Sequence, residues 1–210
     1  MLATGRDASA YPLGELPAHL LLIQNWGFTS ALSWNHPAWS ISTEFAAYLV
    51  FPALVLMARW DRVPSAVLLG LAAVLAGGIF VLFSANGHSD LGADIPGLGL
   101  WRCLASFAMG CLMCQLWQRW SGATNSGLLA ALVCGAIIAA AFTFGLPETS
   151  WVPAAFFTGL LALALGRGVL VRLLGGKALT YLGEISYSTY LGHYGLFILF
   201  KIAFVDASLQ

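Results

Sequence analysis

The sequence predicts an all-α membrane protein, a polytopic bundle of about six transmembrane helices with a short N-terminal interfacial helix. Three observations predict this class. Of the 210 residues, 60% are hydrophobic and only 9% are charged, whereas about a quarter of the residues in a soluble domain are charged. The apolar runs are hydrophobic on all sides, without the polar stripe of a helix that faces water. Six of these runs approach the length of about 20 residues that spans a bilayer.

The charge balance narrows the class of partners. Nine Lys and Arg residues oppose nine Asp and Glu residues, so the formal net charge is zero. A protein that binds nucleic acid carries a basic surface, and an acidic tail attracts cationic partners. The sequence has neither pattern, so we expect a lipid bilayer and no nucleic acid as partner.

The four cysteines do not indicate a disulfide framework. All of them lie inside apolar runs, where a thiol packs like a small hydrophobic group. Cys111 and Cys114 form a CxxC pair, which a zinc or redox site would also use. Because no histidine or second cysteine pair stands nearby to complete four ligands, we expect no metal site and interpret the pair as helix packing.

The helices are expected in the following order along a single membrane-embedded domain, residues 1–210. The first residues lack the apolar core of a signal peptide. Residues 16–26 are predicted to form the interfacial helix, because the apolar stretch Leu20–Ile23 is too short to span. The expected spans are Ile41–Ala58, Ser65–Phe83, Leu98–Trp117, Gly127–Phe144, Trp151–Leu165 and Thr180–Phe204.

The loops between these spans alternate in charge. Loops 59–64, 118–126 and 166–179 together hold six Lys or Arg residues, whereas loops 84–97 and 145–150 hold none. The positive-inside rule then places the three basic loops in the cytoplasm and both chain ends outside, in a multi-pass protein of the cell (inner) membrane. Lys201 opposes this orientation unless its side chain reaches an interface.

Four ionisable residues stand at expected membrane depth, where a central charge costs about 2.5–3.5 kcal/mol: Glu44, Arg102, Glu184 and His193. Glu44 suits the first turn of a helix, where a carboxylate meets the positive end of the helix dipole. It also suits a buried acceptor that orients a hydroxyl or a cation. Arg102 suits either a snorkelling side chain or a donor to a carboxylate, phosphate or carbonyl oxygen. Their similar depth gives the hypothesis of a Glu44–Arg102 contact.

The last span carries a polar face. At 100° per residue, Ser186, Thr189 and Tyr190 lie on the same side as His193, and Glu184 lies roughly opposite. A histidine in a helix is commonly a hydrogen-bonded structural group. Among hydroxyl groups in a membrane span, His193 is also a candidate for taking up a proton.

Three blocks resemble acyltransferase family 3, the bacterial integral-membrane O-acyltransferases. Residues 35–52, with Trp39, Ser40, Ser42 and Glu44, are similar to its WSxSxE-x3-Y-x3-P block. Arg102, Phe107 and Gly110 match an R-x4-F-x2-G span. Residues 182–193 are similar to its LGxxSYSxYLxH helix, which ends at His193. The blocks stand in the family's order over most of the chain.

The resemblance implies transfer of an acyl group, often acetyl, from acyl-CoA to a hydroxyl of a cell-surface or lipid-linked carbohydrate, with no bound cofactor. It implies that a histidine of the family's first helix normally acts as the base, and that His193, the best imidazole available in this sequence, has an acceptor-site or supporting role. It also implies that Glu44 orients the acceptor and that Arg102 stabilises charge or serves as a structural partner. Substrate contacts are expected from Trp39, Ser40, Ser42, Ser186 and Tyr190.

The opening helices of the family have no counterpart in this sequence. They carry an Arg and a His regarded as central to catalysis and a basic RxxR stretch. We therefore expect a fragment or shortened member, completed by N-terminal helices or by a second subunit. The competing hypothesis is a non-catalytic membrane module that binds or transports a small solute.

Overall fold

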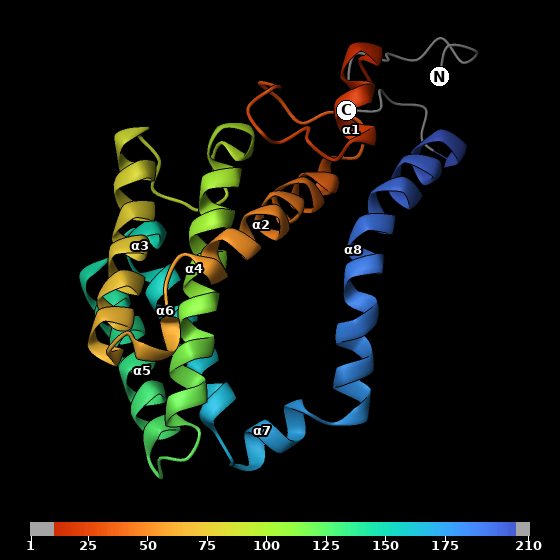
Figure 1. Cartoon of the computed structure of the whole chain (residues 1–210). Coiled ribbons are helices and arrows are strands. Elements are labelled where there is room, and N and C mark those ends of the chain that lie inside the picture. Colours follow the sequence, from red (N-terminus) through yellow and green to blue (C-terminus); the bar gives the residue numbers. More distant parts are fainter. Residues whose placement is uncertain (1–10, 205–210) are drawn as a thin grey trace. The chain divides into compact units, whose positions relative to one another are not determined.

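The computed structural model describes residues 11–204, and its regular elements are helices (Figure 1). Helical backbone satisfies its own hydrogen bonds, as lipid requires. The elements are η2 (Leu13–Glu15), α1 (Leu16–Leu20), η3 (His36–Ala38), α2 (Trp39–Leu56), η4 (Trp60–Arg62), α3 (Ser65–Ala85), α4 (Ile95–Trp120), α5 (Ser126–Phe144), α6 (Glu148–Leu165), α7 (Val169–Leu174) and α8 (Lys177–Phe204).

The six predicted spans appear as α2, α3, α4, α5, α6 and α8, which confirms the all-α polytopic class. Within residues 11–204, five helices are long and apolar enough to cross a membrane: α2 together with η3, and α3 to α6. α8 has 28 residues but is not among them, because the polar residues of its first half lower its hydropathy.

The interfacial helix is shorter than predicted. Helix was expected over residues 16–26, but α1 ends at Leu20. Leu22 adopts the left-handed conformation, with φ of 58°, which a helix of L-residues does not accommodate. The amide of Ile23 returns to the carbonyl of Ala18 at 2.9 Å, and the chain continues as irregular loop. The short α7 was not predicted, since residues 166–179 were expected to be a loop.

The start of α4 is set by a side-chain cap. The prediction began this span at Leu98, whereas the helix begins at Ile95. The Asp94 carboxylate accepts a hydrogen bond from the amide of Gly97 at 3.1 Å, which satisfies one free N–H of the first turn. A Cβ atom at Gly97 would lie 2.3 Å from that carboxylate, so the cap in this form needs a glycine there.

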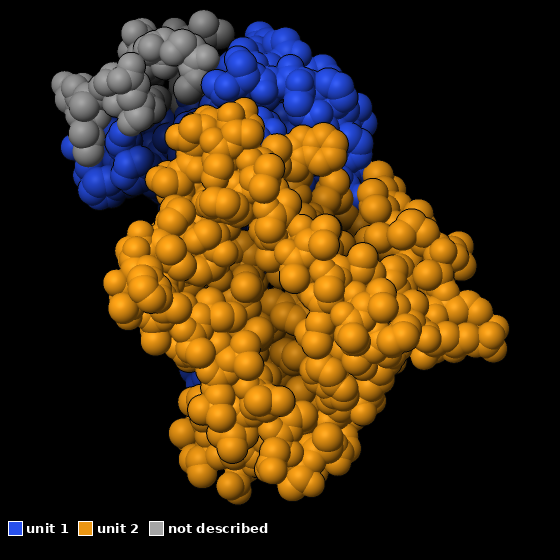
Figure 2. All heavy atoms as spheres, turned by 90° about the vertical axis from the view of Figure 1, so that its left-hand side faces the viewer, with its two compact units in different colours: residues 1–46, 94–100, 174–210 blue, residues 47–93, 101–173 orange. Residues whose placement is uncertain are grey.

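The chain forms two compact units, coloured separately in Figure 2. Unit 1 comprises residues 1–46, 94–100 and 174–210, and unit 2 comprises residues 47–93 and 101–173.

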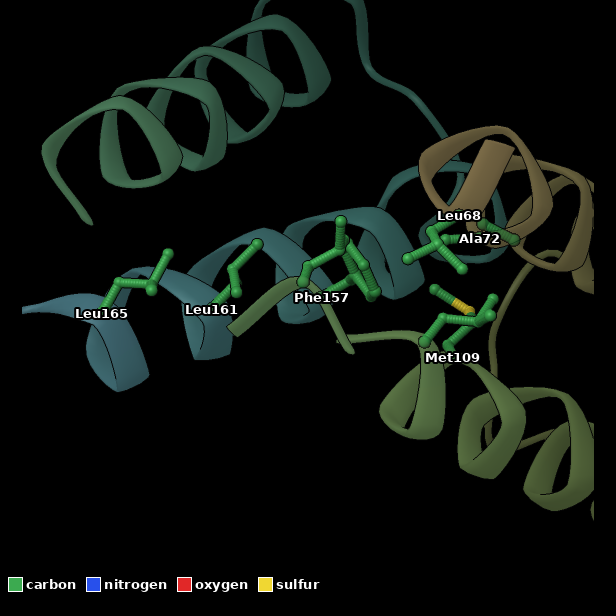
Figure 3. Close-up of a cluster of buried hydrophobic side chains, with 9 residues drawn as sticks. Leu68, Ala72, Met109, Phe157, Leu161 and Leu165 are labelled. Atoms are coloured by element: carbon green, nitrogen blue, oxygen red, sulfur yellow. The ribbon is translucent and has the colours of Figure 1, made fainter. Parts of the chain in front are cut away.

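Unit 2 contains the main apolar core, formed where α3, α4 and α6 meet. Phe157, Leu161 and Leu165 recur every four residues along one side of α6, and Figure 3 shows them with Leu68 and Met109 of the neighbouring helices. This spacing is that of one face of a helix. The buried cluster comprises Leu68, Ala72, Ala76, Met109, Leu112, Leu116, Phe157, Leu161 and Leu165.

Helix α5 packs closely on α6. A Cβ atom at Gly127 would lie 3.1 Å from the backbone of Gly166, and one at Gly159 would lie 3.3 Å from the Cys134 sulfur. The Cys134 thiol donates to the carbonyl of Ala155 at 3.3 Å. Small residues therefore allow the close approach of these helices, as is common in membranes.

The basic loops of unit 2 meet at one end of its helices. Arg119 donates to the carbonyl of Trp60 at 2.6 Å and also to that of Val63. Arg167 donates to the carbonyl of Ser121 at 2.5 Å. At the opposite end of these helices, the amide of Thr149 donates to the carbonyl of Ser89 at 3.4 Å. The predicted alternation of α3 to α6, with basic loops gathered at one end, is therefore present within unit 2.

Candidate functional site

The predicted site residues divide between the two units. Trp39, Ser40, Ser42, Glu44, Ser186, Tyr190 and His193 belong to unit 1, and Arg102 belongs to unit 2. Unit 1 therefore contains seven of the eight, although they come from α2 and α8 at opposite ends of the chain. The Glu44–Arg102 contact stays a prediction.

Glu44 is joined to α8 by a hydrogen bond. The hydroxyl of Tyr187 donates to Oε2 of Glu44 at 3.1 Å, across 143 residues of sequence. A second contact runs parallel to it: Tyr194 stacks on His36, with ring centroids 5.1 Å apart and an interplanar angle of 25°. Because Tyr187 and Tyr194 are nearly two turns apart, they lie on one side of α8. We call this side the tyrosine face.

The sequence prediction did not include Tyr187 among the site residues. Tyr187 lies within the block that resembles the family's last helix, so a signal was present. The prediction concentrated on the side of the helix that carries His193, and the centre of the tyrosine face lies about 100° away from it around the axis. Only the fold shows that this side meets the first turns of α2.

The start of α2 is held by buried hydrogen bonds. The Ser42 side chain is fully buried, and its hydroxyl accepts from the amide of Asn25 at 3.1 Å. Its carbonyl accepts from the indole N–H of Trp26 at 2.9 Å. The hydroxyl of Ser40 donates to the carbonyl of Pro37 at 3.0 Å. In this structure both serines fix local backbone, and their contact with a substrate stays a prediction.

The polar face of α8 has the predicted composition. Ser186, Thr189, Tyr190 and His193 line one hollow along the helix, together with Leu182 and Ile185. These side chains come from successive turns, as the 3.6-residue period requires.

The ring of His193 is oriented by its own helix. Nδ1 of His193 contacts the carbonyl of Tyr190, and because a carbonyl oxygen only accepts, we assign the proton to Nδ1. In the neutral ring, Nε2 then carries the lone pair. The ring of Tyr190 lies 5.7 Å from that of His193. This arrangement suits Nε2 to take a proton from a hydroxyl group.

Arg102 lines a partly open cavity of about 330 Å³ within unit 2. A volume of about 300 Å³ is at the lower end of the range for ligand sites. The walls are mostly apolar and come from α3, α4 and α6, with Leu91 from the loop before α4. Gly110, which matches the same sequence block as Arg102, also lines the cavity. Phe107 of that block instead packs edge-on against Phe51, with centroids 5.9 Å apart.

A chain of hydrogen bonds orders the N-terminal loop of unit 1. The hydroxyl of Ser33 donates to Glu15 at 2.5 Å, so it must accept from Nε2 of His19 at 2.9 Å. Burial lowers the pKa of His19, and the nearby carboxylate of Glu15 opposes this shift only in part. Sequence reasoning did not single out these residues, because they lie 14 and 18 positions apart without a motif.

The described residues offer no obvious metal or disulfide chemistry. Within residues 11–204, no three His, Cys, Asp or Glu side chains group closely enough to hold a metal ion. Cys111 and Cys114 are free thiols on α4.

Comparison with known proteins agrees with the three sequence blocks. A family model described as "Acyltransferase domain" (Acyl_transf_3) matches residues 7–210. Acyltransferase MdmB of Streptomyces mycarofaciens is 31% identical over 192 residues, which cover 83% of this chain and 49% of MdmB. The chain thus spans about half the length of that relative. No solved structure matches the chain. With its five apolar helices the chain is a multi-pass membrane protein, and it belongs to the Acyl_transf_3 family of acyltransferase domains.

Proposed function

We propose that this chain serves O-acyl transfer in the cell (inner) membrane, from acyl-CoA to a hydroxyl of a cell-surface or lipid-linked carbohydrate. Family membership supports the reaction class. The observation that supports the chemistry most directly is His193, whose Nδ1 contacts a backbone carbonyl and whose helix face carries Ser186, Thr189 and Tyr190.

In the proposed reaction, the acceptor hydroxyl attacks the carbonyl carbon of the thioester while its proton passes to Nε2 of His193. The tetrahedral intermediate collapses, the carbon–sulfur bond breaks, and the CoA thiolate leaves. The thiolate then takes the proton from His193, so the ring returns to its neutral form. The products are the acyl ester and CoA.

Glu44 is proposed to orient the acceptor. Its carboxylate accepts the hydrogen bond from Tyr187, which fixes its position relative to α8. The remaining lone pairs of a carboxylate can accept from a further hydroxyl. The family resemblance assigns Arg102 the task of stabilising the developing oxyanion, for which a guanidinium is chemically suited.

The reaction is tested with membranes that contain this chain together with the N-terminal half of a relative, with radiolabelled acetyl-CoA and a carbohydrate acceptor. We expect transfer above that of membranes without the chain. His193→Ala should lower the rate by about 10²–10⁴, as loss of a general base does, and Glu44→Gln should also lower it at unchanged protein level. His88→Ala, in a loop of unit 2, is the matched control and should retain activity.

Two outcomes would overturn the proposal. One is acyl transfer no greater than that of membranes without the chain. The other is solute flux that needs no acyl-CoA, which would favour the transport or binding module. Membranes that contain this chain without the N-terminal half of a relative test whether further helices or a second subunit complete the site.

The proposed orientation has a separate test. Loops 59–64, 118–126 and 166–179 are proposed to face the cytoplasm because of their basic residues. Single cysteines placed in these loops of a chain lacking its native cysteines should resist a membrane-impermeant thiol reagent in intact cells. Cysteines in loops 84–97 and 145–150 should react.

A further inference from the structure

We propose that the cavity of unit 2 binds one hydrocarbon chain of a membrane phospholipid, with Arg102 at the phosphate. The inference does not rest on the acyl-transfer proposal, although both involve Arg102, and it is supported by the shape, the polarity and the depth of the cavity.

The cavity is elongated along α4. Arg102, Ser106, Met109, Gly110 and Met113 all line it and fall within about 100° of one another around the helix. Arg102 and Met113 are eleven residues apart, which is about 16 Å along the axis at 1.5 Å per residue.

The cavity has room for a single hydrocarbon chain. Its volume is about 330 Å³, which is at the lower end of the range for ligand sites. The walls beside it, such as Met109 and Phe157, are apolar.

The positive charge of Arg102 lies at one end of the apolar cavity, where a phospholipid with one chain in the cavity would have its phosphate. Arg102 lines the end near the start of α4, and Met113 lines the other end. Arg102 is seven residues after Ile95, about 10 Å along a helix of about 39 Å, whereas the hydrocarbon core is about 30 Å thick. The guanidinium therefore lies within reach of the phosphate level of the nearer leaflet, and the chain points toward the membrane centre.

The same order of charge argues against the chain of acyl-CoA as the occupant. The CoA head group would lie on the side of the basic loops, which are at the Met113 end of the cavity. The apolar end of the acyl chain would then lie next to the charged guanidinium of Arg102. A lipid-linked saccharide has the correct order of head and chain. We choose the phospholipid because it surrounds the protein in large excess, and occupancy rises with concentration.

The experiment uses the full chain in phosphatidylcholine vesicles that contain a phosphatidic acid with a photoactivatable diazirine at the end of one chain. We expect cross-links at the Met113 end of the cavity. Gly110→Leu should reduce them at least about fivefold, because a Cβ atom built at Gly110 has no heavy atom within 4 Å and a larger side chain would fill the cavity. Gly135→Leu, on α5 and equally open, is the matched control and should not change them.

A second arm tests the phosphate. The same probe without its phosphate, a diacylglycerol, should label the cavity less in the native chain, and Arg102→Gln should abolish the difference. This readout is binding, so it separates a lipid role of Arg102 from a role in acyl transfer. A third arm needs no variant: shorter chains should move the cross-links from Met113 toward Arg102.

Several results would overturn the inference. One such result is that the probe labels α5 and the cavity to the same extent and that Gly110→Leu does not change the labelling. The cross-links would then come from ordinary contact with bulk lipid. Displacement of the probe by an equimolar lipid-linked saccharide would assign the cavity to the acceptor. Absence of acyl transfer by the chain would leave this binding test intact, so the two proposals fail separately.

Discussion

The two units bury different chemistry. Among the described residues, fourteen of the sixteen buried hydrophobic residues lie in unit 2, the exceptions being Ala46 and Leu98. Five of the six buried polar residues lie in unit 1: Gln24, Asn25, Ser33, Ser42 and Thr43. Long helices satisfy their own backbone, so unit 2 is free to pack by side-chain volume.

Unit 1 contains an irregular loop, whose backbone needs other partners. The amide of Asn25 donates to Ser42, and its side chain donates to the carbonyl of Ile95 at 3.1 Å. Gln24 donates to the carbonyl of Ala38 at 2.9 Å. We infer that volume changes matter most in unit 2, and that lost hydrogen bonds and pH changes matter most in unit 1.

The largest expected effect is on the core of unit 2. Phe157→Ala should lower the free energy of unfolding by about 3–5 kcal/mol, because it removes a buried aromatic ring and leaves a cavity. Denaturant titration in mixed micelles measures this change. Phe142→Ala, at a position that is 78% exposed, should change little. If Phe157→Ala lowered the free energy of unfolding by less than about 1 kcal/mol, the inference that volume changes matter most in unit 2 would be wrong.

Unit 1 should respond to the loss of one hydroxyl. Ser42→Ala leaves the buried amide of Asn25 without its acceptor, at an expected cost of about 1–3 kcal/mol. Ser40→Ala removes only a local bond to Pro37 and should cost less. Thermal unfolding followed by tryptophan fluorescence compares the two variants, and equal effects would contradict the assignment of Ser42 to backbone support.

A backbone effect of about 1 kcal/mol is expected at the end of α5. Gly145 has a φ of 60° and closes the helix by donating to the carbonyl of Ala141, a conformation that favours glycine. Gly145→Ala should therefore destabilise unit 2. Gly135→Ala, inside α5, should stabilise it by about 0.5–1 kcal/mol. The opposite signs are the test, and a stabilising Gly145→Ala would refute this explanation of the cap.

The smallest effect concerns pH and the N-terminal loop. Burial lowers the pKa of His19 from its ordinary value of 6.5, so the unfolded chain binds a proton at a higher pH than the folded chain. Stability is therefore fully present above pH 6.5 and declines as the pH falls from 6.5 through the lowered pKa. The protection factors of residues 15–35 in hydrogen exchange, which compare each observed rate with the intrinsic rate at the same pH, should fall on acidification. His19→Gln should flatten that dependence, and an unchanged slope would count against His19 as the cause.

The sequence was sufficient for the long helices. Length and uniform hydrophobicity set α3 and α5, and each predicted boundary lies within two residues of the observed one. The end of α1 was missed because it depends on the backbone of Leu22 and on contacts with a distant loop. The observed start of α4 lies three residues before the predicted one, because the Asp94 carboxylate accepts a hydrogen bond from the amide of Gly97 in its first turn.

The candidate site was predictable only in part. The sequence blocks singled out Glu44 and His193, whose roles in the site stay predictions. Helical periodicity placed Ser186, Thr189, Tyr190 and His193 on one face of α8, and these residues line one hollow in the structure. The bond between Tyr187 and Glu44 spans 143 residues, and no local pattern specifies such a pairing. The cavity beside Arg102 likewise needs α3 and α6, which the motif of α4 does not contain. Whether residues 1–210 act as a single domain stays a prediction.

The tyrosine face has a consequence for biosynthesis. A ribosome delivers the chain from its N-terminus, so the segment with His36 and Glu44 enters the membrane long before Tyr187 and Tyr194 are made. During that interval neither residue has its partner from α8. The first turns of α2 therefore gain their contacts with α8 only when the last helix has been made. A premature stop codon between α7 and residue 187 would leave a protein with helices α1 to α7 translated, in which Glu44 never acquires its hydrogen bond from Tyr187.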